Sequence, residues 1–110
     1  MSQGDIIWVG LPGGEGRAQA GRRPAVILQD DSLNLPTVAV VPLSSQLAAL
    51  RFPATVLLEP DATNGLRVSS VALVFQVRAV DTSYLGNRLG SISRTKFNEL
   101  LAALDELTGR

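Results

Sequence analysis

The chain has 110 residues, of which 45% are hydrophobic, which suffices for one modest core and leaves no room for a second domain. Ten basic and ten acidic residues give a net charge of zero, so an anionic partner has to be bound by a local patch. Cysteine and histidine are absent, which excludes disulfides, thiol catalysis and a zinc site built on these side chains. We therefore expect a single domain over residues 1–110, with no metal and no cofactor.

We expect no targeting or membrane segment in this sequence. Its first residues, MSQGDIIWV, lack a charged leader followed by a long apolar run, and nowhere are there about 18 continuous apolar residues. The absence of cysteine suits a reducing compartment. We therefore expect a cytoplasmic protein without a membrane partner.

The first strand is predicted over residues 5–9, because DIIWV is rich in β-branched and aromatic side chains. Trp8 is expected in the core, with a ligand-binding tryptophan as the alternative. The turn-forming segment GLPGGEG follows, and the connection over residues 10–21 is longer than most in a small domain. Loops of this length commonly carry function, so this one is a candidate binding loop or lid.

Residues 16–28, GRAQAGRRPAVIL, join a loop of small residues to a β-branched strand. Glycine and alanine around Gln19 let backbone and ligand approach closely, and Arg22 and Arg23 bring two guanidinium groups to the start of the strand. Pro24 is expected to open a strand over residues 25–28 and to hold Arg23 on an extended support. The alternative is that both arginines are solvated charges. The nearby glycines and later hydroxyl residues favour a candidate active site here.

Two more strands are predicted over residues 37–43 (TVAVVPL) and residues 55–58, separated by a helical turn over residues 47–50. The first of these ends at Ser44 and Ser45, and Pro42 within it indicates an edge strand or a strand end. Asn64 and Gly65 supply a turn.

The longest β segment is predicted over residues 69–80, SSVALVFQVRAV. Its continuous apolar first half indicates burial on both faces. Gln76 and Arg78 are two residues apart and so share one face, which is a candidate for the face that Arg23 reaches.

From Ser93 the apolar residues follow the period of a helix, with Ser93 as the expected N-cap and Gly109 as the expected C-terminal stop. The predicted apolar stripe, which should pack across the sheet, consists of Phe97, Leu100, Leu101, Leu104 and Leu107. Short strands followed by one helix predict a mainly β fold with a C-terminal helix, as a small antiparallel barrel or sheet.

In combination and order, these segments resemble the MazF/PemK family of toxins from bacterial toxin–antitoxin pairs. The resemblance runs through GDIIWV, GRAQAGRRPAVIL, VVPLSSQ, FPATV and SSVALVFQVRAVD. It implies an SH3-like small antiparallel barrel of the CcdB, Kid and MazF type, and a homodimer that binds RNA in a groove between subunits. It also implies a sequence-specific, metal-independent endoribonuclease, an mRNA interferase that inhibits growth by cleaving single-stranded RNA or mRNA, and a cognate antitoxin protein.

The resemblance assigns catalytic roles to two positions. The family's arginine before the loop-exit proline is Arg23 here, and the hydroxyl residue that ends the next strand is Ser44. Candidate RNA-binding residues are Arg17, Gln19, Arg22, Ser45, Gln46, Gln76 and Arg78. The chain departs from the family twice: it has Ala18 where a glutamate commonly precedes the glutamine, and Phe75 where an acidic residue often precedes the later glutamine.

Such a site can act on RNA without a metal, because the 2′-hydroxyl of RNA attacks the adjacent phosphate and leaves a cyclic phosphate and a free 5′-hydroxyl. The protein then has to orient the substrate and stabilise charge on the phosphoryl oxygens. Arg23 suits this task, since its fork of donors can hold two phosphate oxygens, and Ser44 can add a hydroxyl donor. Arginine stays protonated and histidine is absent, so the sequence assigns no general base.

Two alternatives belong to other functional classes. A non-enzymatic, gyrase-poisoning toxin of the CcdB type has the same fold, but that class relies on a tryptophan near its C-terminus, whereas this chain ends ELTGR. An SH3-like interaction module would need an aromatic-lined groove, and the chain has five aromatic residues.

Overall fold

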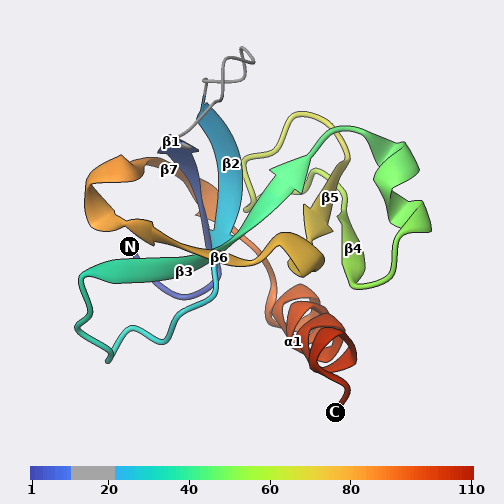
Figure 1. Ribbon diagram of the computed structural model, residues 1–110. Helices are drawn as coiled ribbons and strands as arrows, with labels where there is room; N and C mark the ends of the chain where they lie inside the picture. The colour runs from blue at the N-terminus through green and yellow to red at the C-terminus, as the bar shows by residue number, and fades with distance from the viewer. Residues whose placement is uncertain (11–21) are drawn as a thin grey trace, which may run out of the picture.

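The computed structural model describes residues 1–10 and 22–110, and consists of antiparallel strands, short 3-10 turns and one α-helix (Figure 1). The strands are β1 (Asp5–Gly10), β2 (Arg22–Ile27), β3 (Thr37–Ser44), β4 (Thr55–Leu58), β5 (Ser70–Leu73), β6 (Arg78–Asp81) and β7 (Leu85–Ser91). The 3-10 turns are η2 (Leu47–Arg51), η3 (Val74–Gln76) and η4 (Thr82–Tyr84), and the helix is α1 (Arg94–Thr108). The predicted mainly β fold with a C-terminal helix is confirmed. The predicted loop over residues 10–21 lies outside the described residues except for Gly10. Arg17 and Gln19 therefore also lie outside them.

The strands form one seven-stranded sheet in the order β4-β5-β3-β2-β1-β7, with β6 paired to β3 off this path. β3 therefore has two partners on one side, β6 along residues 37–40 and β5 along residues 43–44. Figure 1 shows a strongly coiled sheet with β4 and β5 on one side and β7 on the other. Pairings among the described residues leave it open between β4 and β7, a geometry compatible with the SH3-like barrel that the sequence predicts.

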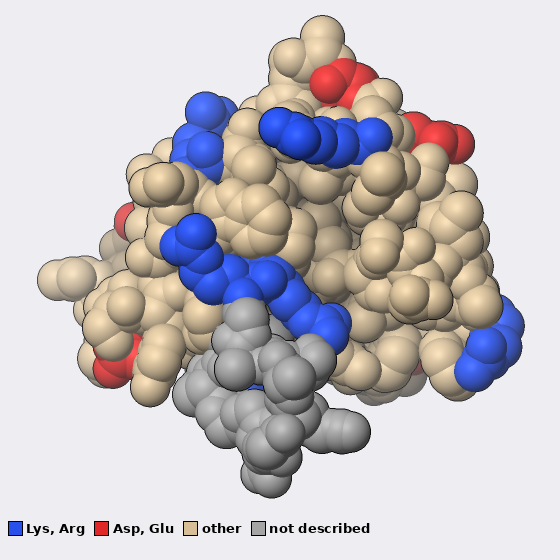
Figure 2. All heavy atoms as spheres, turned by 90° about the horizontal axis from the view of Figure 1, so that it is seen from above, with Lys and Arg blue, Asp and Glu red and all other residues tan. Residues whose placement is uncertain are grey.

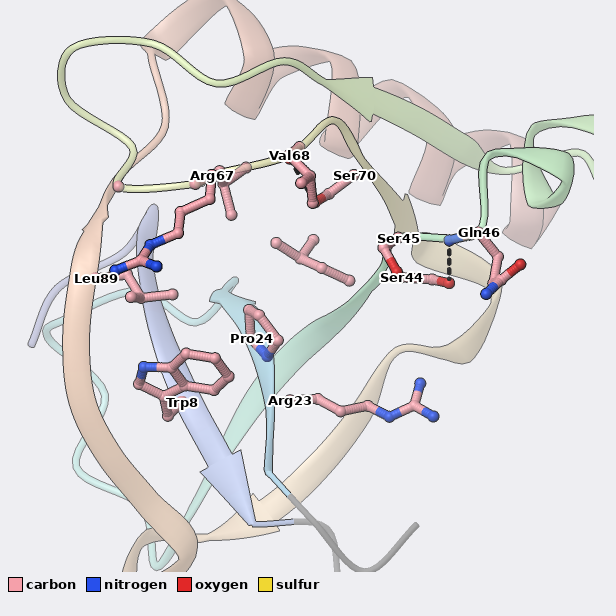
Figure 3. A pocket seen from close by; sticks show the side chains of 13 residues that line it. Trp8, Arg23, Pro24, Ser44, Ser45, Gln46, Arg67, Val68, Ser70 and Leu89 are labelled. Atoms are coloured by element: carbon pink, nitrogen blue, oxygen red, sulfur yellow. Dashed lines mark hydrogen bonds between the residues drawn. The ribbon is translucent and has the colours of Figure 1, made fainter.

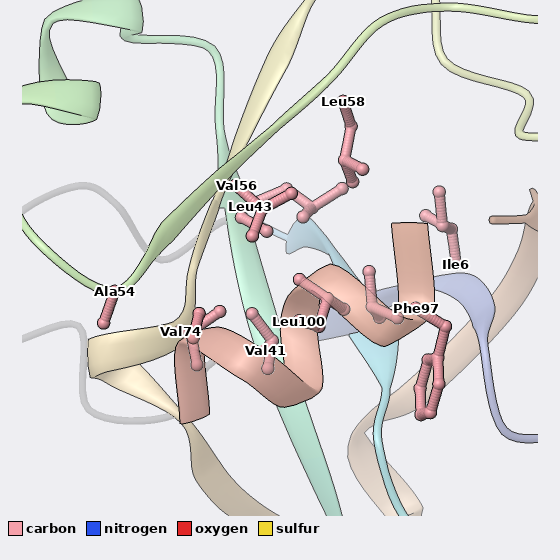
Figure 4. Packing of buried hydrophobic residues seen from close by; sticks show 12 residues of the cluster. Ile6, Val41, Leu43, Ala54, Val56, Leu58, Val74, Phe97 and Leu100 are labelled. Atoms are coloured by element: carbon pink, nitrogen blue, oxygen red, sulfur yellow. The ribbon is translucent and has the colours of Figure 1, made fainter. Parts of the chain in front are cut away.

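The central strands bury apolar side chains on both faces, because alternate residues of a strand point to opposite sides. One face gives Ile6, Val26 and Val41 to the main core, which is closed by α1 (Figure 4). The other face gives a smaller core, which contains Ile7, Val9, Ala25, Ile27, Val40 and Val80. The β-branched runs in these strands are thus explained by burial on both sides.

Helix α1 begins and ends at the predicted residues. The Ser93 hydroxyl accepts a hydrogen bond from the Lys96 N–H at 3.1 Å, and Gly109 ends the helix in the left-handed conformation at a φ of 81°. The described part of the chain contains no helix with the length and apolar character of a membrane span.

The predicted apolar stripe of α1 is only partly correct. Phe97, Leu100 and Ala103 are buried, whereas Leu101 is 38% exposed and Leu107 is 44% exposed. Leu101 follows Leu100 and so lies about 100° around the helix from it, beyond the edge of the buried face. Ala103 occupies that face instead, because a small side chain allows close approach to the sheet.

The prediction of one strand over residues 69–80 is wrong, because η3 separates β5 from β6. The register explains the interruption: Leu43 pairs with Ala72 and Val40 pairs with Arg78, so β3 spans the gap with fewer residues than the opposing segment. The surplus residues fold into η3. Phe75, at its centre, packs against Phe52 with ring centroids 5.5 Å apart. Phe75 therefore serves packing at the position where the resemblance led us to expect an acidic residue.

Both strand prolines lie deeper in the sheet than predicted. Pro42 is buried inside β3 and pairs with Ala25 of β2, so it marks neither an edge nor a strand end. Proline has no backbone N–H to donate. Pro42 lies opposite the interruption between β5 and β6, so no hydrogen bond between strands is lost there. Pro24 lies inside β2 and pairs with Trp8, because this strand begins at Arg22.

Candidate active site

A pocket of about 380 Å³ opens where β2 and β3 meet the loop between β4 and β5 (Figure 3). Three parts of the chain form most of its lining: Arg23 and Pro24 of β2, residues 43–46 at the end of β3, and residues 65–68 of the loop. Trp8, Leu89 and Ser70 complete it. The volume is within the range of about 300–1,000 Å³ that is usual for ligand sites.

The sheet register brings the two predicted catalytic residues together. Ala25 of β2 pairs with Pro42 of β3, and the strands are antiparallel. The same register, extended two residues toward the N-terminus of β2 and two residues toward the C-terminus of β3, places Arg23 opposite Ser44, although they are far apart in sequence. Both residues line the pocket, on the same side of it in Figure 3.

Ser44 is held in a local turn at the end of β3. Its hydroxyl oxygen accepts the Gln46 N–H at 3.0 Å, which is the dashed line in Figure 3. The hydroxyl proton stays available to donate to a ligand, because the oxygen is the acceptor in this contact. Ser45 and Gln46 are exposed and also line the pocket, so this turn places two hydroxyls and an amide beside Arg23.

Trp8 is half-buried and lines the pocket, so the prediction that it lies in the core is wrong in part. The Arg22 guanidinium lies 5.9 Å from the centroid of its ring, a distance typical of a cation–π contact. Arg22 is exposed and is not part of the pocket lining among the described residues. The pocket therefore has one aromatic surface with a cation beside it.

The wall opposite β2 is the loop over residues 59–69, which is fixed by its own side chains. One Asp61 carboxylate oxygen accepts the N–H groups of Thr63 and Asn64, both at 2.8 Å. Asn64, 2% exposed, donates to the Glu59 carbonyl at 2.8 Å and accepts the Leu66 N–H at 3.0 Å. The bonds from Thr63 and Asn64 lower the pKa of Asp61, so their stabilisation is present at neutral pH and is lost as pH falls through the lowered pKa.

The loop is also fixed against β7. The Ser91 N–H donates to the Thr63 carbonyl at 3.0 Å. A Cβ added to Gly90 would lie 2.3 Å from the Thr63 carbonyl oxygen, and one added to Gly65 would lie 2.2 Å from the Leu89 carbonyl oxygen. Glycine is therefore required on both sides of this contact, and the wall has little freedom to move.

Gly90→Ala is expected to destabilise the protein by about 1–3 kcal/mol, because the new methyl group meets backbone that cannot rotate away. Urea unfolding followed by circular dichroism measures the loss. Gly10→Ala is the matched control, because the nearest atom of the described residues to its new Cβ is 3.9 Å away. Equal stability of the two variants would contradict a tight contact between the loop and β7.

The predicted site residues fall into three groups. Arg23, Ser44, Ser45 and Gln46 are brought together in the pocket, with Arg22 beside it over Trp8. Gln76 and Arg78 are exposed and do not line it, and they lie on η3 and β6, so the two-residue spacing of one strand does not apply to them. Arg17 and Gln19 lie outside the described residues. The roles of all these residues stay predictions.

Sequence reasoning missed Arg67, which lines the pocket opposite Arg23. The Asn64-Gly65 turn was a signal that the chain reverses just before it. The sequence does not show where this loop packs, because its position depends on the contact with β7.

The described pocket lining carries two arginines and no aspartate or glutamate. Figure 2 shows Lys and Arg side chains on both sides of a shallow hollow in the face seen from above, with acidic groups towards the margin. The ligand that this lining suits is an anion with a flat apolar part. Within residues 1–10 and 22–110, no group of three or more His, Cys, Asp or Glu side chains could hold a metal ion.

The fold and the sequence define the class of protein. Residues 2–108 match the PemK-like, MazF-like toxins of type II toxin–antitoxin systems, and the chain belongs to this family. It is 33% identical over 107 residues to the endoribonuclease MazF of Staphylococcus saprophyticus, an alignment that covers 96% of this chain and 88% of that protein.

Solved structures agree with this assignment. The crystal structure of MazF (Form-I) from Deinococcus radiodurans superposes with a TM-score of 0.79 at 27% identity, over 100% of this chain and 97% of that one. The MazE-MazF (Form-II) structure from the same organism gives 0.76 at 26% identity, over 99% and 95%.

Proposed function

We propose that residues 1–110 form the toxin of a type II toxin–antitoxin pair, a cytoplasmic endoribonuclease that cleaves single-stranded RNA sequence-specifically and without a metal. The observation that carries the proposal is the register that sets Arg23 opposite Ser44 in a pocket whose described lining has no acidic residue. Family membership and a relative named endoribonuclease MazF support it.

In the proposed reaction, the ribose 2′-oxygen attacks the adjacent phosphorus and the bond from phosphorus to the 5′-oxygen breaks. In the net reaction the proton of the 2′-hydroxyl is replaced by a proton on the leaving 5′-oxygen, so no proton is gained or lost overall and the products are a 2′,3′-cyclic phosphate and a 5′-hydroxyl. Negative charge builds on the phosphoryl oxygens along the way. Arg23 stabilises this charge through two N–H donors, and the Ser44 hydroxyl adds a third donor from the neighbouring strand.

The pocket also orients the substrate. Pro24, Leu43 and Trp8 offer an apolar surface to a ribose and an unstacked base, beside the polar groups that bind phosphate. Holding the 2′-oxygen in line with the leaving oxygen lowers the barrier without any proton transfer by the protein. We assign no side chain as general base. Slow turnover suffices for a toxin, so electrostatic stabilisation and orientation can carry the reaction.

The two alternatives receive less support. A gyrase-poisoning toxin of the CcdB type needs a tryptophan near the C-terminus, and the sole tryptophan, Trp8, lines the pocket. A polyproline-binding module needs an aromatic-lined groove. Trp8 is the one aromatic side chain among the described residues that line the pocket.

Incubation of the purified protein with a long mixed-sequence RNA in EDTA tests the proposed function. We expect cuts at a limited set of sequences, which sequencing of the new ends identifies. An intact RNA at high protein concentration, with the protein shown to be folded, would contradict endoribonuclease activity. Activity that appears only when divalent metal is added would contradict the metal-free mechanism.

We also expect the protein to be a homodimer. Leu47, Leu50 and Phe52, on η2 and just after it, are each at least 40% exposed, and apolar surface of this kind commonly marks an interface. Light scattering at micromolar concentration should give twice the chain mass of 11.6 kDa. A monomer mass under these conditions would count against a stable dimer.

A cognate antitoxin protein is the proposed inhibitor, and we expect it to lay an acidic segment over Arg22 and Arg23. Carboxylates can occupy places meant for phosphates, and charge should set the speed and register of binding more than its strength. Binding should therefore weaken with salt without vanishing. Competition with a short, non-cleavable RNA tests whether the antitoxin occupies the pocket. RNA that stays fully bound at saturating antitoxin would exclude inhibition at the pocket.

A further inference from the structure

Arg67 stands across the pocket from Arg23, on a wall that the proposed reaction does not use. Figure 3 shows its guanidinium on the side of Leu89 and Trp8, with Arg23 and Ser44 on the other side. We propose that Arg67 binds a second phosphate of the RNA, that of a nucleotide next to the scissile linkage, so that one nucleoside lies between two arginines. This inference rests on the proposed function.

The surroundings of Arg67 leave its charge available to a ligand. Among the described residues, the side-chain ion pairs are those of Arg88 with Asp5 and of Lys96 with Glu99, so Arg67 is in neither. The acidic groups closest to it in sequence are engaged in the loop itself: Glu59 accepts the Ser69 hydroxyl at 2.7 Å, and Asp61 accepts backbone N–H groups. A guanidinium that has no acidic partner among these residues, at the edge of a pocket, is suited to an incoming phosphate.

The backbone beneath Arg67 is preorganised. Asn64 and Gly65 fix the turn that precedes it, and the Ser70 hydroxyl donates to the Val68 carbonyl at 3.1 Å just after it. The docking of Thr63 on β7 then fixes the distance between this wall and β2. A cation on such a support loses less freedom on binding than one on a mobile loop, which favours affinity.

The centre of the pocket suggests what lies between the two arginines. Pro24, Leu43 and Leu89 are apolar, and Trp8 adds a flat aromatic surface. A nucleoside matches this lining, because a base can stack on an aromatic ring while its flanking phosphates reach the cations. The ligand class is therefore a single strand with phosphates on both sides of one bound nucleoside.

Binding of a non-cleavable RNA tests the proposal. The probe is an oligonucleotide that contains the mapped cut site with a 2′-deoxy residue at the cut, followed by fluorescence anisotropy at several salt concentrations. Arg67→Gln should weaken Kd about tenfold, as expected for loss of a charged hydrogen bond. It should also reduce the salt slope by about 0.7, the value for one phosphate of a single strand. Arg94→Gln, at the start of α1, removes the same charge away from the pocket and should change neither quantity.

A methylphosphonate scan separates a phosphate contact from a structural effect. Replacing one phosphate next to the cut by a neutral linkage should weaken binding of the unmodified protein and have little further effect on Arg67→Gln. In cleavage, Arg67→Gln should raise KM with kcat within about twofold, because this contact is the same in substrate and transition state. Arg67→Lys, which keeps the charge, should retain most of the salt slope.

The outcomes distinguish this inference from the proposed function. If the unmodified protein cleaves RNA while Arg67→Gln keeps its Kd and salt slope, the role of Arg67 is overturned and the function stands. If no neutral linkage beside the cut affects the unmodified protein, the second phosphate site is overturned without reference to any variant. If the unmodified protein neither binds nor cleaves RNA, both fail.

Discussion

Arg23→Ala is expected to abolish RNA cleavage while leaving the fold unchanged. Arg23 lies at the start of β2, on the rim of the pocket and opposite Ser44, so its removal takes the proposed principal cation away from the scissile phosphate. Loss of one donor that stabilises transition-state charge costs about 2.7–4 kcal/mol in comparable sites, which is roughly a hundredfold to a thousandfold in kcat. Single-turnover cleavage of an RNA with a mapped cut site measures this loss.

The controls for Arg23→Ala separate chemistry from stability. Arg94→Ala removes an arginine from the helix start and should cleave normally, and circular dichroism should show that both variants are folded. Ser44→Ala should reduce the rate less than Arg23→Ala does, because Ser45 is adjacent and also lines the pocket. Near-normal cleavage by a folded Arg23→Ala protein would refute its assignment as the principal phosphate contact.

Leu100→Ala is expected to lower the free energy of unfolding by about 2–5 kcal/mol, the range for removing a fully buried leucine side chain. Leu100 is 0% exposed and is part of the main core between α1 and the sheet (Figure 4). The helix contacts β4 and η3 through this core, so the cavity weakens the attachment of α1. Urea unfolding at a fixed protein concentration measures the change.

Leu101→Ala is the matched control, because it is the same substitution one residue along the helix at a side chain that is 38% exposed. Surface substitutions usually change stability by less than about 0.5 kcal/mol. Similar losses for the two variants would contradict the orientation of α1 on the sheet.

The sequence predicted those helix and strand ends that are determined by residues close by in the chain. The ends of α1 follow from Ser93 and Gly109, each of which acts within a few residues of its own position. β4 begins and ends as predicted, because its short apolar run and the turn-forming residues that flank it are both visible in the sequence. The place of Ser44 at the end of β3 was predicted for the same reason.

Features that depend on distant pairing were missed. The break at η3 follows from the register of two strands on β3, which the continuous apolar run over residues 69–80 conceals. β7, LGNRLGS, has no β-branched residue and pairs with β1 through register shifts, so no strand pattern marks it. Arg67 belongs to the pocket because its loop docks on this unpredicted strand.

The most direct test of the proposed mechanism is whether the RNA supplies its own nucleophile. The measurement is cleavage, in EDTA, of an oligonucleotide that carries a 2′-deoxy residue at the mapped cut site, compared with its all-ribose counterpart. We predict that the all-ribose RNA is cut to a 2′,3′-cyclic phosphate and a 5′-hydroxyl, and that the modified RNA stays intact although it still binds. Cleavage of the modified RNA at the same linkage, or products with a 5′-phosphate, would contradict it.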